Sequence, residues 1–417
     1  MTYLTARRLV LLAACIAAIA GLSRPLVAVG QEAGTAPPGV PYVLDARVIG
    51  DDKRVRFVAD MSIPVDAAVF ALADPYRIIV DLPEVHFVLP ETAGTEARGL
   101  VSAFRYGFIA AGKSRIVIDV TGPVAIDKQF VVQPANGQPA RLVIDAVPTT
   151  RAKFLEAATA YRDSHAVAGT KSDRVAGVAG GGAGDRPLIV LDPGHGGIDL
   201  GARGDGGALE KNVVLSFAKA LGARLLATDR YRIVYTRRDD TFVALGDRVA
   251  VARRRNAALF VSVHANSFPT NAVRGAIVYT ASDKASDKMA AELAATENQS
   301  DALAGIDVAA EDSDQVKDIL VDLTRRETRN FGVVFAQSLI KHLGKSTRMF
   351  KIPHQEASFK VLEAPDVPSA LIELGYLTNP DDGKQLVSPE WQEKTAASIV
   401  DAIDAYFGKK TAEGGGQ

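Results

Sequence analysis

The sequence predicts two domains of different class: a small all-β sandwich, followed by an α/β domain with a twisted mixed sheet flanked by helices. Three observations predict this. Short apolar runs separated by Gly, Pro and Asp turns fill residues 42–147. Residues 148–186 have little apolar periodicity and end in a glycine-rich tract. From residue 187 to 408, strand-like and helix-like segments alternate, which is typical of an α/β domain.

The first 30 residues are predicted to be an export signal. Arg7 and Arg8 precede an apolar stretch, residues 9–22, that is short for a membrane span. We therefore expect export by the Sec or twin-arginine route and no stable membrane insertion of the mature chain. Cys15, the only cysteine, lies in this segment, so a metal site in the mature protein must use nitrogen and oxygen ligands. The formal net charge of −1 gives no indication of a nucleic-acid partner.

The predicted β-sandwich contains five clear strand-like runs: VLDARVIG, RVRFVADMS, RIIVDLP, SRIVIDVTG and RLVIDAV. Asp81, Asp119 and Asp145 follow apolar residues near the ends of these runs, where strand-end or turn roles are expected. Residues 148–186 are predicted to be a linker with a helical piece at Arg151–Arg162.

The second domain is expected to contain one sheet covered on both faces, because its connections are short. Its predicted strands are residues 188–192, 231–236, 258–263, 275–280, 359–362 and 370–374. Its predicted helices are residues 210–227, 245–255 and 389–407, with a largely helical stretch at 284–343.

Three residues in this domain form a candidate metal-binding set. His195 follows a buried strand in LIVLDPGHGG, Glu210 starts the next helix, and His264 ends the strand-like run FVSVHANS. Two imidazoles and one carboxylate are a known catalytic zinc shell with a fourth position open to water. Taken singly, each residue also fits an ordinary loop histidine or helix-start glutamate.

Glu373 is the candidate general base, because it lies inside the apolar strand PSALIELGY, where an unpaired carboxylate is costly to bury. Desolvation would raise its pKa towards neutral pH, which suits a base acting on water. The alternative is a salt bridge with Arg248 or Arg253. Asn266 and His354 are candidate substrate contacts, although a turn asparagine and a satisfied loop histidine explain them equally well.

Five blocks from LDPGHGGIDLGA to FKVLEAPDVPSALIELGYLTNP resemble, in order and spacing, the zinc-dependent N-acetylmuramoyl-L-alanine amidases of cell division. The repeated I/V-x-I/V-D endings of the first domain resemble the AMIN domain of periplasmic cell-wall proteins, which implies peptidoglycan binding. The resemblance implies zinc held by His195, Glu210 and His264, with Glu373 activating the water. It also implies cleavage of the amide between N-acetylmuramic acid and L-alanine of the stem peptide in the periplasm, during wall remodelling and daughter-cell separation.

The resemblance further implies that residues 282–330 are a regulatory insertion. In the family, a helix of this insertion blocks the site until an activator with a LytM-type domain displaces it, and an acidic residue fills the open zinc position. Glu297 is the candidate, with Glu292 and Asp283 as alternatives, and each also fits a solvated surface carboxylate. Two other functions stay open: a zinc peptidase acting on the stem peptide, and an inactive cell-wall binding or scaffold protein.

Overall fold

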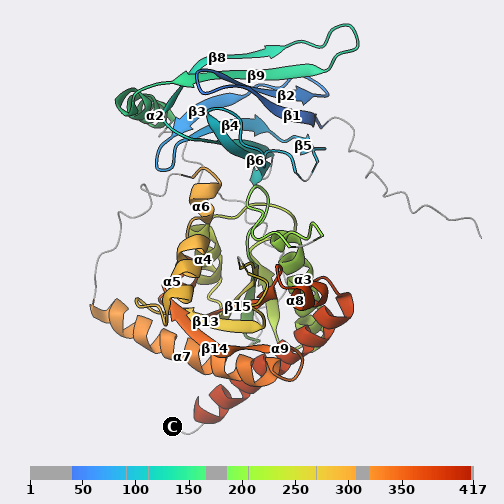
Figure 1. The fold of residues 1–417 in the computed structure, drawn as a ribbon. Coiled ribbons are helices and arrows are strands. Elements are labelled where there is room, and N and C mark those ends of the chain that lie inside the picture. Colours follow the sequence, from blue (N-terminus) through green and yellow to red (C-terminus); the bar gives the residue numbers. More distant parts are fainter. Residues whose placement is uncertain are drawn as a thin grey trace, which may run out of the picture. The chain divides into compact units, whose positions relative to one another are not determined.

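The computed structural model describes residues 40–90, 92–110, 112–165, 186–204, 206–268, 270–306 and 319–414 (Figure 1). The predicted export signal at residues 1–30, most of the predicted glycine tract and residues 307–318 of the predicted insertion lie outside the described residues. None of the described helices is long and apolar enough to cross a membrane.

The N-terminal region is all β, as predicted, and consists of two sheets. One sheet has the order β5-β1-β2-β9-β8 and the other β3-β4-β7-β6. Val43, Phe57 and Ile144 from the first sheet pack with Ile78 and Ile116 from the second in one buried cluster. Alternation of apolar residues therefore builds a sandwich core. The strands are β1 (Tyr42–Gly50), β2 (Val55–Met61), β3 (Ala68–Leu72), β4 (Arg77–Pro83), β5 (His86–Phe87), β6 (Val101–Ala110), β7 (Lys113–Val120), β8 (Val124–Val132) and β9 (Ala140–Pro148).

The acidic residues of these strands form ion pairs between neighbouring strands. Asp81 and Asp145 lie inside β4 and β9, so the expected strand-end or turn role is wrong for them. The physical reason is the strand register, which places an arginine of the adjacent strand directly opposite each of these two carboxylates. The pairs are Arg115–Asp81, Arg105–Asp119 and Arg56–Asp145, each with a bidentate contact that includes a 2.8 Å bond.

The helix expected after the sandwich is present as α2 (Arg151–His165). The α/β region that follows has a six-stranded mixed sheet with the order β11-β10-β12-β15-β13-β14. All neighbouring strands are parallel except β13 and β15, which are antiparallel. The predicted mixed sheet is thus confirmed. Its strands are β10 (Leu188–Pro193), β11 (Arg232–Tyr235), β12 (Leu259–Asn266), β13 (Ala276–Ala281), β14 (Met349–Ala357) and β15 (Ser369–Tyr376).

One predicted strand is wrong. Residues 359–362 form the short 3-10 helix η3 (Lys360–Leu362), and the strand at this edge of the sheet is β14, which the sequence pattern did not predict. The sequence of β14, MFKIPHQEA, has few apolar residues because an edge strand pairs on one side only and is less buried.

Helices cover both faces of this sheet (Figure 1). On one face α3 (Glu210–Ala227), α7 (Ile319–Leu343) and α9 (Pro389–Gly414) pack in one apolar cluster. On the other face α4 (Leu245–Arg254), α5 (Lys288–Glu297) and η3 pack in a second cluster. The short helices α6 (Ser300–Leu303) and α8 (Pro380–Leu386) complete the region.

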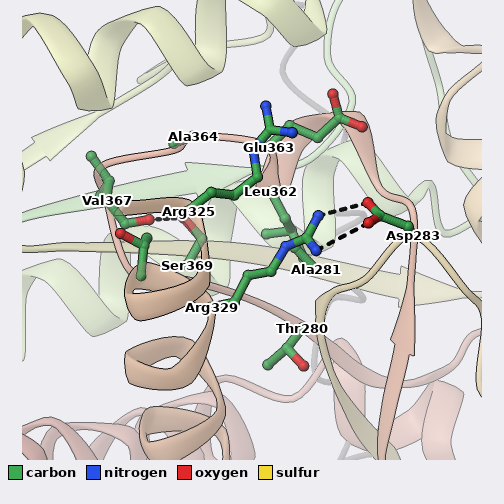
Figure 2. A pocket seen from close by; sticks show the side chains of 11 residues that line it. Thr280, Ala281, Asp283, Arg325, Arg329, Leu362, Glu363, Ala364, Val367 and Ser369 are labelled. Carbon is green, nitrogen blue, oxygen red and sulfur yellow. Dashed lines mark hydrogen bonds and ion pairs between the residues drawn. The ribbon is translucent and has the colours of Figure 1, made fainter. Parts of the chain in front are cut away.

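The strand order positions a ligand site at the ends of β10 and β12. The chain runs from β10 to β11 on one side and then crosses to β12 on the other, so the order reverses between β10 and β12. Open α/β sheets bind ligands outside the carboxyl ends of strands at such a switch point. A separate cavity of about 230 Å³ lies at the opposite ends of the strands, where β13 ends and β15 begins, and Asp283 and Arg329 form an ion pair in it (Figure 2).

Candidate metal centre

The loop after β10 presents His195 to the site. Asp192-Pro193-Gly194 ends the strand, and the Gly194 amide donates to the Val263 carbonyl of β12, 3.0 Å away. A Cβ at Gly194 would lie 2.3 Å from the His264 ring, so only glycine lets the two chains approach this closely. The loop thus brings the two histidine rings together, with 4.9 Å between their centroids.

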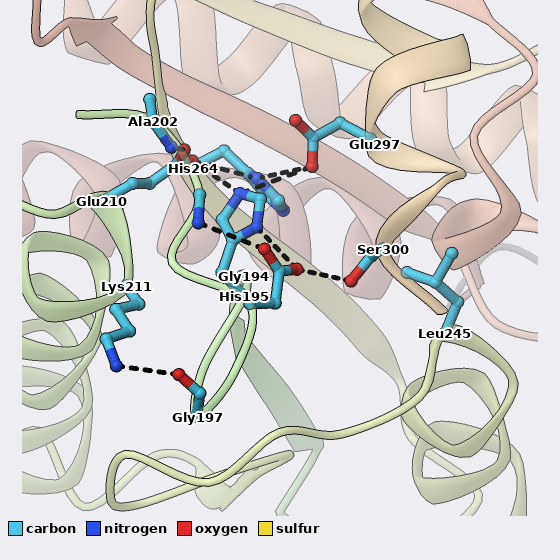
Figure 3. A network of polar contacts seen from close by, with 12 residues as sticks. Gly194, His195, Gly197, Ala202, Glu210, Lys211, Leu245, His264, Glu297 and Ser300 are labelled. Atoms are coloured by element: carbon cyan, nitrogen blue, oxygen red, sulfur yellow. Dashed lines mark hydrogen bonds and ion pairs between the residues drawn. The ribbon is translucent and has the colours of Figure 1, made fainter. Parts of the chain in front are cut away.

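His195, Glu210 and His264 converge at one point (Figure 3). Their donor atoms all lie within 4.8 Å of one another. Glu210 Oε1 is 3.1 Å from His195 Nε2 and 3.2 Å from His264 Nδ1. All three side chains are buried. The structure therefore brings together the three residues that the sequence singled out as ligands.

Asp199 orients His195 from the side opposite to Glu210. A 2.9 Å hydrogen bond joins His195 Nδ1 to Asp199 Oδ2. If His195 donates from Nδ1, its Nε2 keeps a lone pair directed at the cluster, which is the tautomer a metal ligand needs. Although burial acts in the opposite direction, the interactions with His195, including this hydrogen bond, hold the pKa of Asp199 at about 2.

Glu210 is fixed by two backbone amides. Ala265 donates to its Oε1 and Ala202 to its Oε2, each at 2.8 Å. Burial acts to raise the pKa of Glu210, but the two histidines outweigh it and hold this pKa well below its usual range. Glu210 is thus an ionised carboxylate with a fixed orientation, ready to bind a cation.

These residues fit a bound metal. His195 Nε2 and His264 Nδ1 are buried and have no hydrogen-bond partner among the described residues. Buried polar atoms without a partner are costly, and a cation between them and Glu210 would satisfy all three. Two imidazole nitrogens and one carboxylate oxygen are a donor set that suits zinc.

Glu373 lies next to this cluster. It is on β15, in register with His264 of β12, and is 1% exposed. Neither of its carboxylate oxygens has a hydrogen-bond partner in the described part of the chain. Burial raises the pKa of Glu373 well above its usual range, and the charges of Glu210 and Glu297 add to the rise.

The alternative salt bridges of Glu373 are not formed. Arg248 pairs with Asp192, at 2.8 Å, and Arg253 pairs with Asp366, at 3.0 Å. The alternative interpretation, a salt bridge of Glu373 with Arg248 or Arg253, is therefore wrong. Neither arginine neutralises the buried carboxyl group of Glu373.

Of the three acidic residues considered in the insertion, only Glu297 faces the cluster (Figure 3). It is the last residue of α5, and its Oε2 is 3.5 Å from His195 Nε2 and 3.3 Å from His264 Nδ1. Glu292 is exposed beside Lys288, and Asp283 pairs with Arg329 in the separate cavity (Figure 2). Glu297 therefore lies beside the same two histidine nitrogens that face Glu210.

The two candidate substrate contacts lie outside the donor set. The Asn266 side chain accepts a hydrogen bond from the next backbone amide, that of Ser267, which is typical of a turn residue. His354 is half-buried on β14, and its Nε2 is 2.9 Å from Thr280 Oγ1. Burial lowers the pKa of His354. Neither contact points to the metal cluster.

Two residues of the site escaped sequence reasoning: Asp199 and Ser300. Ser300 Oγ donates a 2.5 Å hydrogen bond to the same Asp199 oxygen that His195 contacts. Asp199 had a signal in the sequence, because it is an acidic residue four positions after His195 in an otherwise glycine-rich loop. Ser300 had none, because its partner is 101 residues away.

The fold and the donor set define an α/β domain with a candidate metal centre, which follows a β-sandwich in the sequence. The family model of N-acetylmuramoyl-L-alanine amidases matches residues 189–405, and that of the AMIN domain matches residues 45–146. The chain belongs to this family of amidases, which are metal-dependent enzymes.

Similar proteins match over most of the chain. The amidase AmiC of Neisseria meningitidis is 31% identical over 385 residues, which cover 88% of this chain and 90% of that protein. AmiC of Escherichia coli is 30% identical over 381 residues, with the same two shares. The solved structure of AmiC2 of Nostoc punctiforme is 31% identical, covers 54% of this chain and 99% of that one, and has a TM-score of 0.40.

Proposed function

We propose that this amidase uses zinc, held by His195, Glu210 and His264, to hydrolyse the amide between N-acetylmuramic acid and L-alanine of the peptidoglycan stem peptide. The observation that carries the proposal is the buried donor set with an unpartnered carboxylate, Glu373, on the adjoining strand. This combination is what hydrolysis assisted by a metal requires: three ligands and a nearby base.

A bound zinc ion would polarise the scissile carbonyl and lower the pKa of a water molecule. Glu373 then acts as the proton carrier: its carboxylate takes a proton from the attacking water and delivers it to the amine nitrogen of the leaving L-alanine. Asp199 keeps His195 in the tautomer that binds metal.

We also propose that Glu297 inhibits the enzyme in the described conformation, because its carboxylate lies 3.5 and 3.3 Å from the two histidine nitrogens that would hold the metal. Helix α5 presents it. Asp287 caps the start of α5, and the buried side of the helix is small, formed by Ala290, Leu293 and Ala294. A helix with so little buried apolar area is held weakly by packing alone.

Hydrogen bonds of the residues between and within α5 and α6 also keep the segment that carries Glu297 in place. Asn298 donates to the Ser358 carbonyl and accepts from the Lys360 amide, at 2.7 and 2.8 Å. Asp301 accepts from the Leu245 amide at the start of α4, at 2.9 Å. The segment is therefore held by the contacts of Glu297 with the two histidines and by the hydrogen bonds of Asn298 and Asp301. An activator must break both sets of contacts. A protein with a LytM-type domain is the proposed activator.

The location that we propose for the enzyme follows from its proposed cell-wall substrate. We place the enzyme in the periplasm, exported by residues 1–30, with the AMIN domain on peptidoglycan and a role in wall remodelling and daughter-cell separation. Cell fractionation, with and without residues 1–30, checks this: we expect the intact chain in the periplasm and the shortened chain in the cytoplasm.

The experiment that tests the activity is mass spectrometry of the products released from purified peptidoglycan. It uses the full chain, the Glu297→Ala variant and, as matched control, Glu292→Ala, which changes an exposed glutamate of the same helix. We expect Glu297→Ala to release intact stem peptides that begin with L-alanine at least tenfold faster than the other two. A chelator should abolish release and zinc should restore it.

Other products identify the other functions. Shortened stem peptides would establish a zinc peptidase, and no release from a folded, zinc-loaded Glu297→Ala chain would leave a binding or scaffold protein. Equal rates for all three chains, with the amidase product, would keep the activity and overturn the inhibition by Glu297.

A further inference from the structure

The backbone around His195 has a conformation that needs support. His195 has a φ of +57°, and Gly196 and Gly197 after it have φ values of +126° and +57°. The left-handed region is unfavourable for a residue with a side chain. Such a conformation persists only where the surroundings impose it. The question is which groups hold the loop in this shape.

Two buried arginines hold it through three consecutive carbonyl oxygens. Arg237 donates from Nε to the Pro193 carbonyl, at 2.9 Å, and from Nη2 to the Gly194 carbonyl, at 2.7 Å. Arg248 donates from Nη1 to Pro193 as well, at 2.9 Å, and from Nη2 to the His195 carbonyl, at 2.7 Å. We call Arg237 and Arg248 together the arginine clasp.

Arg248 is itself anchored. It lies in the first turn of α4, is 2% exposed, and donates to Asp192 at 2.8 Å and to the Val243 carbonyl at 2.9 Å. Asp192 in turn accepts from Thr236 and from Ser262, at 2.5 and 2.7 Å. The guanidinium therefore has no freedom to follow the loop, and the loop must follow it.

Arg237 is anchored on other elements. It follows β11, is 4% exposed, and donates to the carbonyls of Lys211 and Asp239, at 2.8 and 2.9 Å. Burial, and then the neighbouring charge of Arg248, lower the pKa of Arg237 to about 10. Burying a charge in this way rarely adds stability, so its benefit must lie in the geometry it enforces.

The clasped loop touches both histidines of the donor set. It carries His195, and Gly194 packs against the ring of His264 so closely that a Cβ would overlap it. A shift of a few tenths of an ångström in the loop would thus displace His195 Nε2 from its position 3.1 Å from Glu210 Oε1. Metal sites lose affinity when their supporting groups allow such shifts.

We infer that Arg237 and Arg248 are positioning residues of the metal centre, which fix the backbone of His195 so that its Nε2 meets Glu210 and His264. The inference rests on the proposed zinc site and names the residues that shape it. The clasp needs the planar fork of arginine, because each guanidinium bridges two carbonyls of the loop, and the point charge of a lysine cannot do this.

The test is the zinc affinity of the full-length Arg237→Lys and Arg248→Lys variants, measured by competition with a colorimetric chelator. Matched controls are Arg238→Lys and Arg253→Lys: Arg238 stacks on the Tyr235 ring, and Arg253 is a half-exposed partner of Asp366 on the same helix as Arg248. We expect each clasp variant to bind zinc about 10 to 100-fold more weakly. We expect the controls to stay within twofold of the unchanged chain.

Circular dichroism and thermal unfolding of the metal-free chains separate positioning from folding. Folded clasp variants with weakened zinc binding support the inference. Unchanged zinc affinity in both folded variants overturns it, and so does a failure of both to fold, because the arginines would then hold the domain and not the histidine. If the unchanged chain binds no zinc, the proposed function itself fails.

Discussion

The two folded regions use the same kind of residue, an aspartate or glutamate in an apolar strand, in opposite ways. In the β-sandwich, Asp145 has a bidentate arginine partner on the adjacent strand. In the α/β region, Glu373 has no hydrogen-bond partner among the described residues, although it is equally buried. A carboxylate with an arginine partner links two strands. A buried carboxyl group without a partner has a raised pKa, which is typical of groups that transfer protons.

The comparison shows that burial alone does not separate structural from chemical carboxylates. Asp145 and Glu373 are each 1% exposed. The two carboxyl groups differ in their neighbours. Hydrogen bonds from Arg56 lower the pKa of Asp145. Burial raises the pKa of Glu373, and its neighbours Glu210 and Glu297 raise it further. The charged groups beside a buried carboxyl group therefore predict whether its role is structural or chemical. Substitutions that remove the charge without changing the shape can test this.

The largest effect is expected from Glu373→Gln. Loss of the base should lower the rate of stem-peptide release by about 10² to 10⁴-fold, which is the usual contribution of general acid–base catalysis. Thermal unfolding should be unchanged or shifted upward, because the variant no longer buries an unpaired acid. The rate of stem-peptide release and the unfolding temperature, the latter by calorimetry, are measured in the Glu297→Ala background. A Glu373→Gln chain that keeps its rate but unfolds at a lower temperature would show that Glu373 is a structural residue.

The next effect is expected from the metal. Zinc at a thousandfold excess over its dissociation constant should stabilise the α/β region by about 4 kcal/mol, because it binds the folded state only. His264→Ala should lose this response, since one of the three donors is missing. Thermal scans with zinc and with chelator measure this response. The His342→Ala variant serves as control, because its ring lies on α7 and its Nδ1 is 2.8 Å from the Ser338 carbonyl.

The smallest effect is expected from Asp145→Asn, with a pH dependence of known sign. The hydrogen bonds from Arg56 lower the pKa of Asp145 below its usual 3.8, so the pair stabilises the fold above that pH and the stabilisation is lost as pH falls through the lowered pKa. Because Arg56 is half-exposed, we expect a loss of about 1 kcal/mol at pH 7. The free energies of unfolding of the two chains should converge as the pH falls below the lowered pKa of Asp145. A difference that grows on acidification would contradict the assignment.

Much of the fold was predictable because it follows from local patterns. Alternation in residues 42–147 indicated a sandwich, and a buried run that ends in a glycine loop placed His195 at the end of a strand. The errors fell where burial is one-sided or where partners are distant. Edge strand β14 lacks a continuous apolar run, and the partner of Asp81 is 34 residues away.

The sequence by itself determined the chemistry available: two histidines and a glutamate at element ends, a glutamate inside an apolar strand, and a family resemblance spanning both domains. Only the tertiary structure decided which side chains meet. In the folded chain Glu297, and not Glu292 or Asp283, faces the donor set. Arg248 donates to the His195 carbonyl and does not pair with Glu373. The physical reason is that the rotation of a helix on a sheet depends on packing from several distant segments, which no local pattern encodes.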